Sequence, residues 1–226
     1  MIVVNFKNFR SGVGNGAIGL ARICEKVGKE CGVEIVAAVS ALDVSDVSRD
    51  VGIGVWLQHV DGVEYGAYSG WILPELAKER GARGAIINHS EHKLLNDEIR
   101  RAVARSKQSD LATCVCADSL EEAVRLSELE PDYIAYEPAE LIGNRDKSVS
   151  SEKGEMIGEI VKRLAGRRVL IGAGVHSVED IRVGLKLGAR GFLVASDAVL
   201  AADPEKELRE LAGGFGYGGS GNSGGV

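Results

Sequence analysis

The strongest constraint in this sequence is the alternation of short apolar runs with amphipathic segments, which continues to about residue 212. Each run is almost continuously apolar, as expected of a parallel strand covered on both faces. The eight predicted strands are residues 2–6, 33–39, 52–57, 83–88, 111–117, 132–137, 168–173 and 191–195. Eight βα units in a chain of this length favour an α/β fold of the closed (β/α)₈ barrel type over an open, doubly wound sheet.

Several segments between these strands have the apolar spacing of three and four residues that is typical of amphipathic helices. They are residues 96–108, 119–129, 150–166 and 177–188. Ser119, Ser151 and Ser177 stand at expected N-cap positions, and Glu122 and Asp180 follow Ser119 and Ser177 at the capping-box spacing. We expect these helices to cover the outside of the barrel.

The length and composition indicate one domain followed by a tail. The chain has 226 residues, 45% of them hydrophobic, which suffices for a single core. We expect residues 1–212 to form one barrel domain. Residues 213–226 (GGFGYGGSGNSGGV) are predicted to be a flexible tail, because Gly and Ser bury too little surface to offset the entropy of ordering.

The charge pattern argues against two classes of partner. The net charge of −6 comes without a basic run, so the electrostatic footprint of a nucleic-acid-binding protein is missing. No stretch of about 18 apolar residues could span a membrane, and Met1 leads directly into a strand-like run rather than a secretion signal. These features predict a cytoplasmic protein.

The sequence has four cysteines, and no two of them form a C-x-x-C pair. We therefore expect these cysteines to be reduced and to serve as packing residues; they are Cys24, Cys31, Cys114 and Cys116. The C-V-C stretch is predicted to lie in a strand and to direct its two thiols to opposite faces.

Polar residues at the ends of the predicted strands are the candidate site, because active sites of these barrels lie at the carboxyl ends of the strands. The candidates are Asn5, Lys7, Gln58, Asn88, His89, Glu137, the turn 172–174 and the pair Ala195–Ser196. Two turns, a glycine-containing one after the seventh strand and Ala195–Ser196 after the eighth, stand where such barrels commonly bind phosphate on backbone N–H groups.

Lys7 and His89 each have more than one interpretation. A lone Lys at a strand end is usually a solvated cap; Lys7 could also form a Schiff base, but an electrostatic partner for an anionic substrate is simpler. His89 could be a structural residue, or it could bind metal together with His92, although the sequence marks no third ligand. A helical turn beginning at Ser90 and Glu91 would favour a neutral imidazole that donates a hydrogen bond.

Three short motifs of this sequence, taken in order along the chain, resemble those of a known enzyme family. The motifs NFK at 5–7, HSE at 89–91 and AYEP at 135–138, with the two turns, are similar to those of triosephosphate isomerase over residues 1–212. The short chain and the EPAELIG loop resemble the archaeal branch. The resemblance implies a TIM barrel that needs no cofactor or metal and interconverts dihydroxyacetone phosphate and glyceraldehyde 3-phosphate in glycolysis and gluconeogenesis.

The same resemblance implies a role for each residue. Glu137 would be the base, His89 would polarise the carbonyl group, and Lys7 would stabilise the negative enediolate. The implied substrate-binding residues are Asn5, Lys7, Ile142, Gly174, Ala195 and Ser196. Glu91 would orient the neighbouring network.

Two loops are also assigned by the resemblance. Pro138 would fix the start of a lid over the substrate, and Gly143 with Asn144 would form its far hinge. The loop 58–70 would enter a neighbouring subunit, with Ser69 near the active-site lysine. A homo-oligomer is therefore expected, in the archaeal branch a tetramer made of two dimers.

Two other functions remain open at this point. One is a different reaction of a sugar phosphate, because the same phosphate site recurs on barrels with unrelated chemistry. The other is a non-catalytic sensor of a phosphate ligand, although binding alone would not require Glu137.

Overall fold

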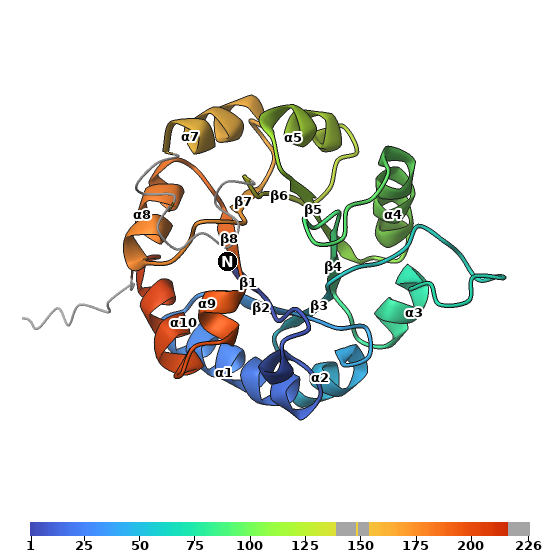
Figure 1. Ribbon diagram of the computed structural model, residues 1–226, viewed down its shortest axis with the longest axis horizontal. Helices are drawn as coiled ribbons and strands as arrows, with labels where there is room; N and C mark the ends of the chain where they lie inside the picture. Colours follow the sequence, from blue (N-terminus) through green and yellow to red (C-terminus); the bar gives the residue numbers. More distant parts are fainter. Residues whose placement is uncertain (139–147, 149–153, 217–226) are drawn as a thin grey trace, which may run out of the picture.

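The computed structural model of the protein describes residues 1–138, 148 and 154–216. Within these residues, eight parallel strands pair in chain order, and β8 pairs with β1 to close a barrel (Figure 1). The strands are β1 (Ile2–Asn5), β2 (Ile35–Val39), β3 (Gly54–Leu57), β4 (Gly84–Ile87), β5 (Ala112–Ala117), β6 (Tyr133–Tyr136), β7 (Val169–Ile171) and β8 (Gly191–Val194). The predicted (β/α)₈ barrel is confirmed.

Helices form a ring around the strands (Figure 1). They are α1 (Asn15–Cys31), α2 (Val44–Asp50), α3 (Pro74–Glu79), α4 (Asn96–Gln108), α5 (Leu120–Ser127), α7 (Gly154–Arg163), α8 (Val178–Lys186), α9 (Ser196–Val199) and α10 (Pro204–Gly213), with a 3₁₀ turn η1 (Arg10–Gly12). Two predicted caps are confirmed, because Ser119 and Ser177 accept hydrogen bonds from the N–H groups of Glu122 and Asp180. Ser151 lies outside the described residues. None of the helices in the described ranges is long and apolar enough to cross a bilayer.

The apolar side chains form two layers, one inside the barrel and one between strands and helices. The inner layer contains Val3, Val36, Ala38, Trp56, Ile86, Cys114, Cys116, Ala135, Leu170 and Leu193. The prediction that Cys114 and Cys116 face opposite sides was wrong. Side chains alternate along a strand with a period of two, so residues two apart share a face, and both thiols lie inside the barrel.

The ordered packing continues past the end of α10. The ring of Phe215 packs edge-on against the buried ring of Phe192, with centroids 5.8 Å apart. Gly214 lies so close to α8 that a Cβ there would come within 2.5 Å of Ile181. Phe215 thus belongs to the packed barrel although it falls in the segment predicted as a tail, and residues 217–226 lie outside the described residues.

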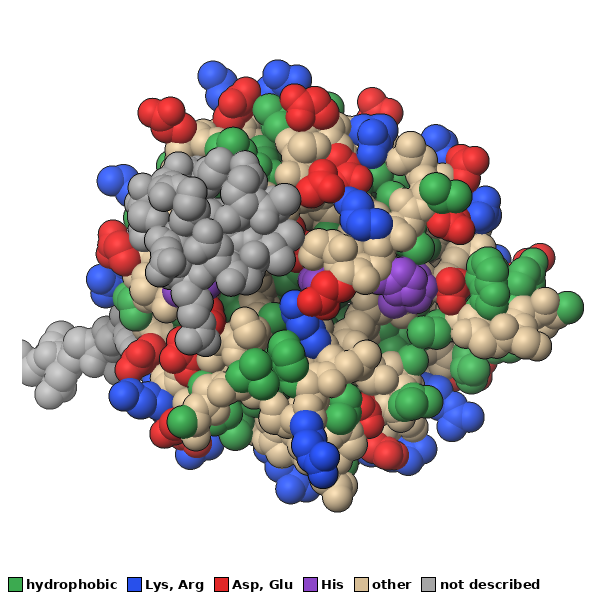
Figure 2. Space-filling view, in the orientation of Figure 1, with side chains coloured by type: hydrophobic (Ala, Val, Ile, Leu, Met, Phe, Trp, Pro, Cys, Tyr) green, Lys and Arg blue, Asp and Glu red, His purple; other side chains and the backbone are tan. Residues whose placement is uncertain are grey.

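The connection between β3 and α3 protrudes from the barrel (Figure 1). Its base is closed by Asp61, whose N–H donates to the carbonyl of Ile72 at 2.9 Å and whose carboxylate accepts from the N–H of Ile72 at 2.7 Å. Figure 2 shows apolar side chains gathered on this projection. Its exposed aromatic residues are Tyr65, Tyr68 and Trp71.

Candidate active site

The carboxyl ends of the strands surround one cavity that brings the predicted residues together. Asn5, Lys7, His89, Glu137, Gly174, Ala195 and Ser196 all line it. Ile142, like the other residues of the predicted lid after Pro138, lies outside the described residues. The first and last strands thus contribute to one site because the barrel is closed.

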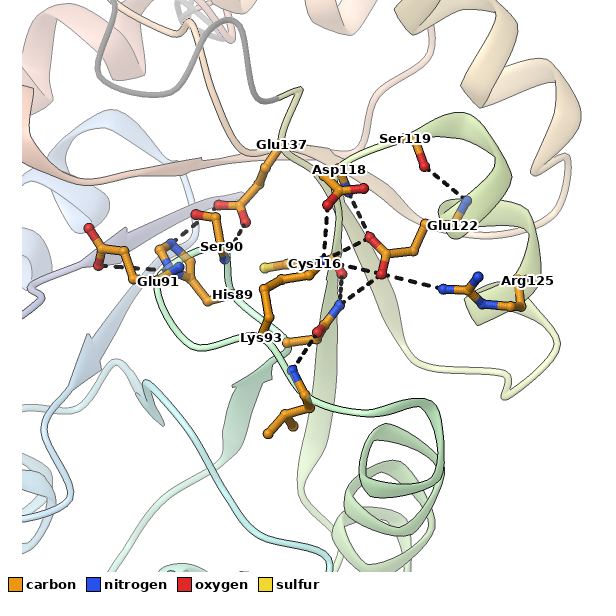
Figure 3. Close-up of polar contacts among 12 residues, drawn as sticks. His89, Ser90, Glu91, Lys93, Cys116, Asp118, Ser119, Glu122, Arg125 and Glu137 are labelled. Carbon is orange, nitrogen blue, oxygen red and sulfur yellow. Dashed lines mark hydrogen bonds and ion pairs between the residues drawn. The ribbon is translucent and has the colours of Figure 1, made fainter.

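Glu137 directly follows β6, and its N–H donates to the carbonyl of Ala117 at 2.8 Å, which extends the strand pairing up to the carboxylate. The side chain is only 3% exposed. Its carboxylate accepts a hydrogen bond from the N–H of Ser90 at 3.4 Å (Figure 3), and the nearby thiol of Cys116 also favours the charged form. Burial outweighs these donors and raises the pKa of Glu137 to about 7.

A glycine makes room for this carboxylate. A Cβ at Gly172, the first residue after β7, would lie 2.6 Å from Cγ of Glu137, well inside van der Waals contact. The glycine that the sequence marked as part of a phosphate turn therefore also determines where Glu137 can stand.

His89 presents a neutral imidazole to Glu137. Its Nδ1 accepts a hydrogen bond from the N–H of Glu91 at 3.1 Å, so the ring proton resides on Nε2, which lies 3.3 Å from Oε1 of Glu137. Burial lowers the pKa of His89 to about 4; Glu91 opposes this shift and Lys7 adds to it. His89 is therefore a neutral donor at physiological pH.

The predicted turn after His89 forms, but it is not the start of a helix. The N–H of His92 donates to the carbonyl of His89 at 2.8 Å, whereas α4 begins only at Asn96. Burial, rather than the end of a helix, keeps the imidazole neutral. The expected neutral imidazole is therefore present, but the expected cause, the start of a helix after His89, was wrong.

The loop that holds His89 is anchored to β5 by Asn88, which has a left-handed backbone with φ 62°. The side-chain amide of Asn88 donates to the carbonyl of Cys116 at 2.9 Å and accepts from the N–H of Leu94 at 3.0 Å. Lys93 adds a second anchor, an ion pair with Glu122 at 2.9 Å (Figure 3). The sequence offered Asn88 as a strand-end residue but gave no sign of Lys93.

Lys7 is held by contacts of its backbone, and its ammonium group forms an ion pair with Glu91. Its φ of 49° lies in the left-handed region, which costs a non-glycine residue about 1 kcal/mol or more. The N–H of Lys7 donates to the side chain of Asn5 at 3.0 Å, and its carbonyl accepts from the side chain of Gln58 at 3.0 Å. Nζ lies 2.6 Å from a carboxylate oxygen of Glu91, which places Lys7 beside His89.

The opposite side of the cavity consists of two backbone turns. Gly174 follows β7 with a φ of 69°, a conformation that favours glycine. Ala195 precedes α9, whose first turn leaves N–H groups without partners inside the helix. His176 and Asp197 join these turns through a contact between Nδ1 and Oδ2. No pattern in the sequence marks this pair.

The structure does not bring His89 and His92 together as metal ligands. The ring of His92 stacks on the ring of His59, with centroids 4.1 Å apart, and Nε2 of His59 lies 3.1 Å from a carboxylate oxygen of Asp61. Across residues 1–138, 148 and 154–216, no group of three or more His, Cys, Asp or Glu side chains is arranged to hold a metal ion.

Comparison with known proteins identifies the family. The family model described as triosephosphate isomerase matches residues 1–211. This chain belongs to the triosephosphate isomerase family. Curated members similar to it include the triosephosphate isomerase of Methanothermus fervidus, 39% identical over 93% of this chain and 96% of the relative, and that of Sulfurisphaera tokodaii, 40% identical over 93% of each.

Solved structures support the same fold. The crystal structure of triosephosphate isomerase from Bartonella henselae superposes with a TM-score of 0.75 and covers 95% of this chain and 98% of that one. Its sequence identity is 22%, so it bears on the fold alone. The membership in the family rests on the family model and the archaeal relatives, and it confirms the resemblance drawn from the three motifs.

Proposed function

We propose that this isomerase interconverts dihydroxyacetone phosphate and D-glyceraldehyde 3-phosphate through an enediolate, with Glu137 as the base. The observation that supports this assignment best is the buried carboxylate of Glu137, whose pKa is raised to about 7 and which faces the neutral Nε2–H of His89. A base is most effective when its pKa lies near the working pH. An unperturbed Glu would be a much weaker base.

His89 and Lys7 would stabilise the negative charge that develops when Glu137 removes a proton from carbon. A neutral imidazole can donate Nε2–H to the carbonyl oxygen and can pass protons between the two oxygens of the enediolate. The ammonium group of Lys7, fixed by its backbone contacts, supplies a positive charge without reorganisation. Glu91, which contacts both residues, would position them.

The two turns would bind the substrate phosphate. Gly174, Ala195 and Ser196 line the same cavity as Lys7, and the backbone N–H groups of such turns are suited to an anion. This arrangement would leave the three carbons of a triose between the phosphate and the pair His89 and Glu137.

Proton NMR in D₂O tests this function directly. Purified protein should convert glyceraldehyde 3-phosphate to dihydroxyacetone phosphate without added metal or nucleotide, and deuterium should enter the product at the carbon that exchanges with the base. Phosphate binding without turnover would point to a sensor, and turnover of a different sugar phosphate alone would point to another barrel enzyme. Either result would refute the proposal.

The pH dependence of kcat/KM should report Glu137. Because the carboxylate must be ionised to act as a base and its pKa is raised to about 7, kcat/KM should fall tenfold per pH unit well below pH 7. His89 stays neutral down to about pH 4 and should add no further limb above that value. Substrate phosphate titrates near pH 6, about one unit lower. A profile that stays flat to pH 6 contradicts this assignment.

We also propose that the protein is a homo-oligomer in which the loop 58–70 joins two subunits into a dimer and two dimers form a tetramer. Tyr65 and Trp71 are 63% and 46% exposed on the projection, which leaves aromatic surface that a partner subunit would cover. A hollow beside Lys7, which Phe9 also lines, would receive the same loop of the partner, with Ser69 nearest the lysine.

Sedimentation at nanomolar concentration tests the oligomer. The parent protein should remain associated, whereas Tyr65→Ser combined with Trp71→Ser should shift it to monomers and lower activity at least tenfold. A compact parent monomer with full activity would contradict the proposal.

A further inference from the structure

Two stacked histidine rings lie beside the active-site cavity. His59 stands two residues after β3, and His92 stands three residues after His89. Their ring centroids are 4.1 Å apart, with an angle of 23° between the ring planes. The side chain of His59 is 13% exposed, whereas His92 is exposed, and both line the hollow beside Lys7. The stack therefore joins two loops that leave different strands of the barrel.

The ring of His59 has a fixed position. Its Nε2 lies 3.1 Å from Oδ1 of Asp61, and because a carboxylate only accepts, the ring donates this Nε2–H. Oδ2 of Asp61 accepts from the N–H of Ile72 at 2.7 Å, so both carboxylate oxygens are engaged. Gly62 lies so close to α4 that a Cβ there would stand 2.5 Å from the backbone nitrogen of Ala102. The loop after β3 therefore gives His59 a rigid support.

His92 ends the turn that carries the proposed electrophile His89. The N–H of His92 donates to the carbonyl of His89 at 2.8 Å, and the N–H of Glu91 donates to Nδ1 of His89 at 3.1 Å. Asn88 ties this turn to β5, and Lys93 ties it to Glu122 on α5 (Figure 3). The ring of His92 ties the same turn to the loop after β3. The turn is thus held from two sides.

The charges around the two rings allow this contact at neutral pH. Burial lowers the pKa of His59; Asp61 and Glu98 on α4 oppose this shift, and His92 adds to it. His59 is therefore neutral at pH 7 and above. A neutral ring can stack on His92 whether or not His92 is charged, because only two cations at this distance would repel each other strongly.

We propose that His59 and His92 are positioning residues that hold the turn 89–92 so that the Nε2–H of His89 points at the carbonyl oxygen of the substrate. This inference rests on the proposed function, in which His89 polarises that carbonyl group. The two rings act through the turn and not on the reacting atoms. Because phosphate would bind on the turns after β7 and β8, loss of the stack should lower kcat by misplacing the donor and should leave the affinity for phosphate unchanged.

The test is a double-mutant cycle in the full-length protein, with kcat, KM and the Ki for inorganic phosphate as readouts. His92→Ala removes the ring on the turn, and His59→Gln removes the other ring but keeps an N–H donor for Asp61. Each should lower kcat about tenfold and change the phosphate Ki less than about twofold. The double variant should lose at most about threefold more than either single variant, because both changes remove the same contact. His92→Phe keeps a flat ring and should recover kcat to within about threefold of the parent value.

A merely structural role makes a different prediction, since it would lower the melting temperature and leave kcat near the parent value. Losses that multiply in the double variant, or a His92→Phe variant as slow as His92→Ala, overturn the inference. A loss that appears only on dilution overturns it too, because His92 would then act through a contact between subunits. If His59→Gln does not fold, the two variants of the exposed His92 decide the question.

The matched control is a ring contact at the other end of the barrel. The guanidinium carbon of Arg168, just before β7, lies 5.0 Å from the ring centroid of Tyr133 at the start of β6. Arg168→Ala removes this contact and should leave kcat unchanged.

Failure of the proposed function has its own signature, because the parent protein would then not isomerise trioses. A parent enzyme that isomerises trioses, together with a His92→Ala variant whose kcat is within about twofold of the parent value, refutes the positioning pair alone.

Discussion

The Glu137→Gln variant is expected to lose roughly 10³- to 10⁴-fold in kcat/KM, because an amide cannot accept the proton that the reaction removes from carbon. The amide has nearly the shape of the carboxylate, so the space beside Gly172 remains filled and the cavity is kept. The phosphate Ki should therefore change less than about threefold. The measurement is steady-state kinetics of triose isomerisation with phosphate as the competitive inhibitor.

Glu137→Asp is the matched variant that keeps a base but retracts it by one methylene. It should lose roughly 10²-fold through misplacement of the carboxylate while retaining an acid limb in its pH profile. A glutamine variant that retains a tenth or more of the parent activity would show that Glu137 is not the base.

The same glutamine variant should be more stable than the parent enzyme at pH 8. The folded state raises the pKa of Glu137 from 4.5 to about 7, so the protein binds this proton more tightly folded than unfolded. The contribution of Glu137 to the free energy of unfolding is fully present below about pH 4.5 and is lost as the pH rises to 7. The loss amounts to about 3 kcal/mol. Glutamine avoids that cost. The gain, measured by urea unfolding, should vanish near pH 4.5.

The eight strands and the positions of Glu137, His89 and Lys7 at their ends followed from the sequence for a physical reason. Strands buried on both faces form continuous apolar runs. A polar residue that directly follows such a run therefore lies at the face of the barrel where the strands have their carboxyl ends. Closure then brings the ends of β1, β4 and β6 to one cavity. The strand-end pattern supplied a longer list of candidates, and the resemblance to the family singled out these three.

The supporting contacts could not be predicted, because they depend on which atoms meet across elements. Gln58 reaches the carbonyl of Lys7 across β2, and nothing in the sequence links residues 51 positions apart. The pair His176 and Asp197, from two different loops, is hidden for the same reason. The left-handed backbone of Lys7 is also invisible to sequence patterns, since a non-glycine residue adopts it only where other contacts impose it.

Replacing Lys7 by Met is expected to lower kcat/KM by roughly 10³-fold without unfolding the protein, because the lost interaction is with the charge of the reacting anion. The hydrogen bonds of Asn5 and Gln58 to Lys7 involve its backbone, and a methionine retains both of them. The former partner Glu91 is 59% exposed, so leaving it unpaired costs little stability. Thermal melting should be close to that of the parent, while kinetics report the loss.

A surface lysine provides the control for this substitution. Lys29 pairs with Glu25 at 2.9 Å on α1 and is 72% exposed, so Lys29→Met should leave both kcat and KM unchanged. The kinetic loss in Lys7→Met should fall on kcat as well as KM, since the charge acts on the enediolate and not only on bound substrate. A Schiff base makes a different prediction: borohydride added with substrate would trap a covalent adduct on Lys7. Such an adduct would show that Lys7 acts covalently rather than electrostatically. If no adduct forms, and if Lys7→Met loses kcat/KM while Lys29→Met does not, then charge stabilisation is the function of Lys7.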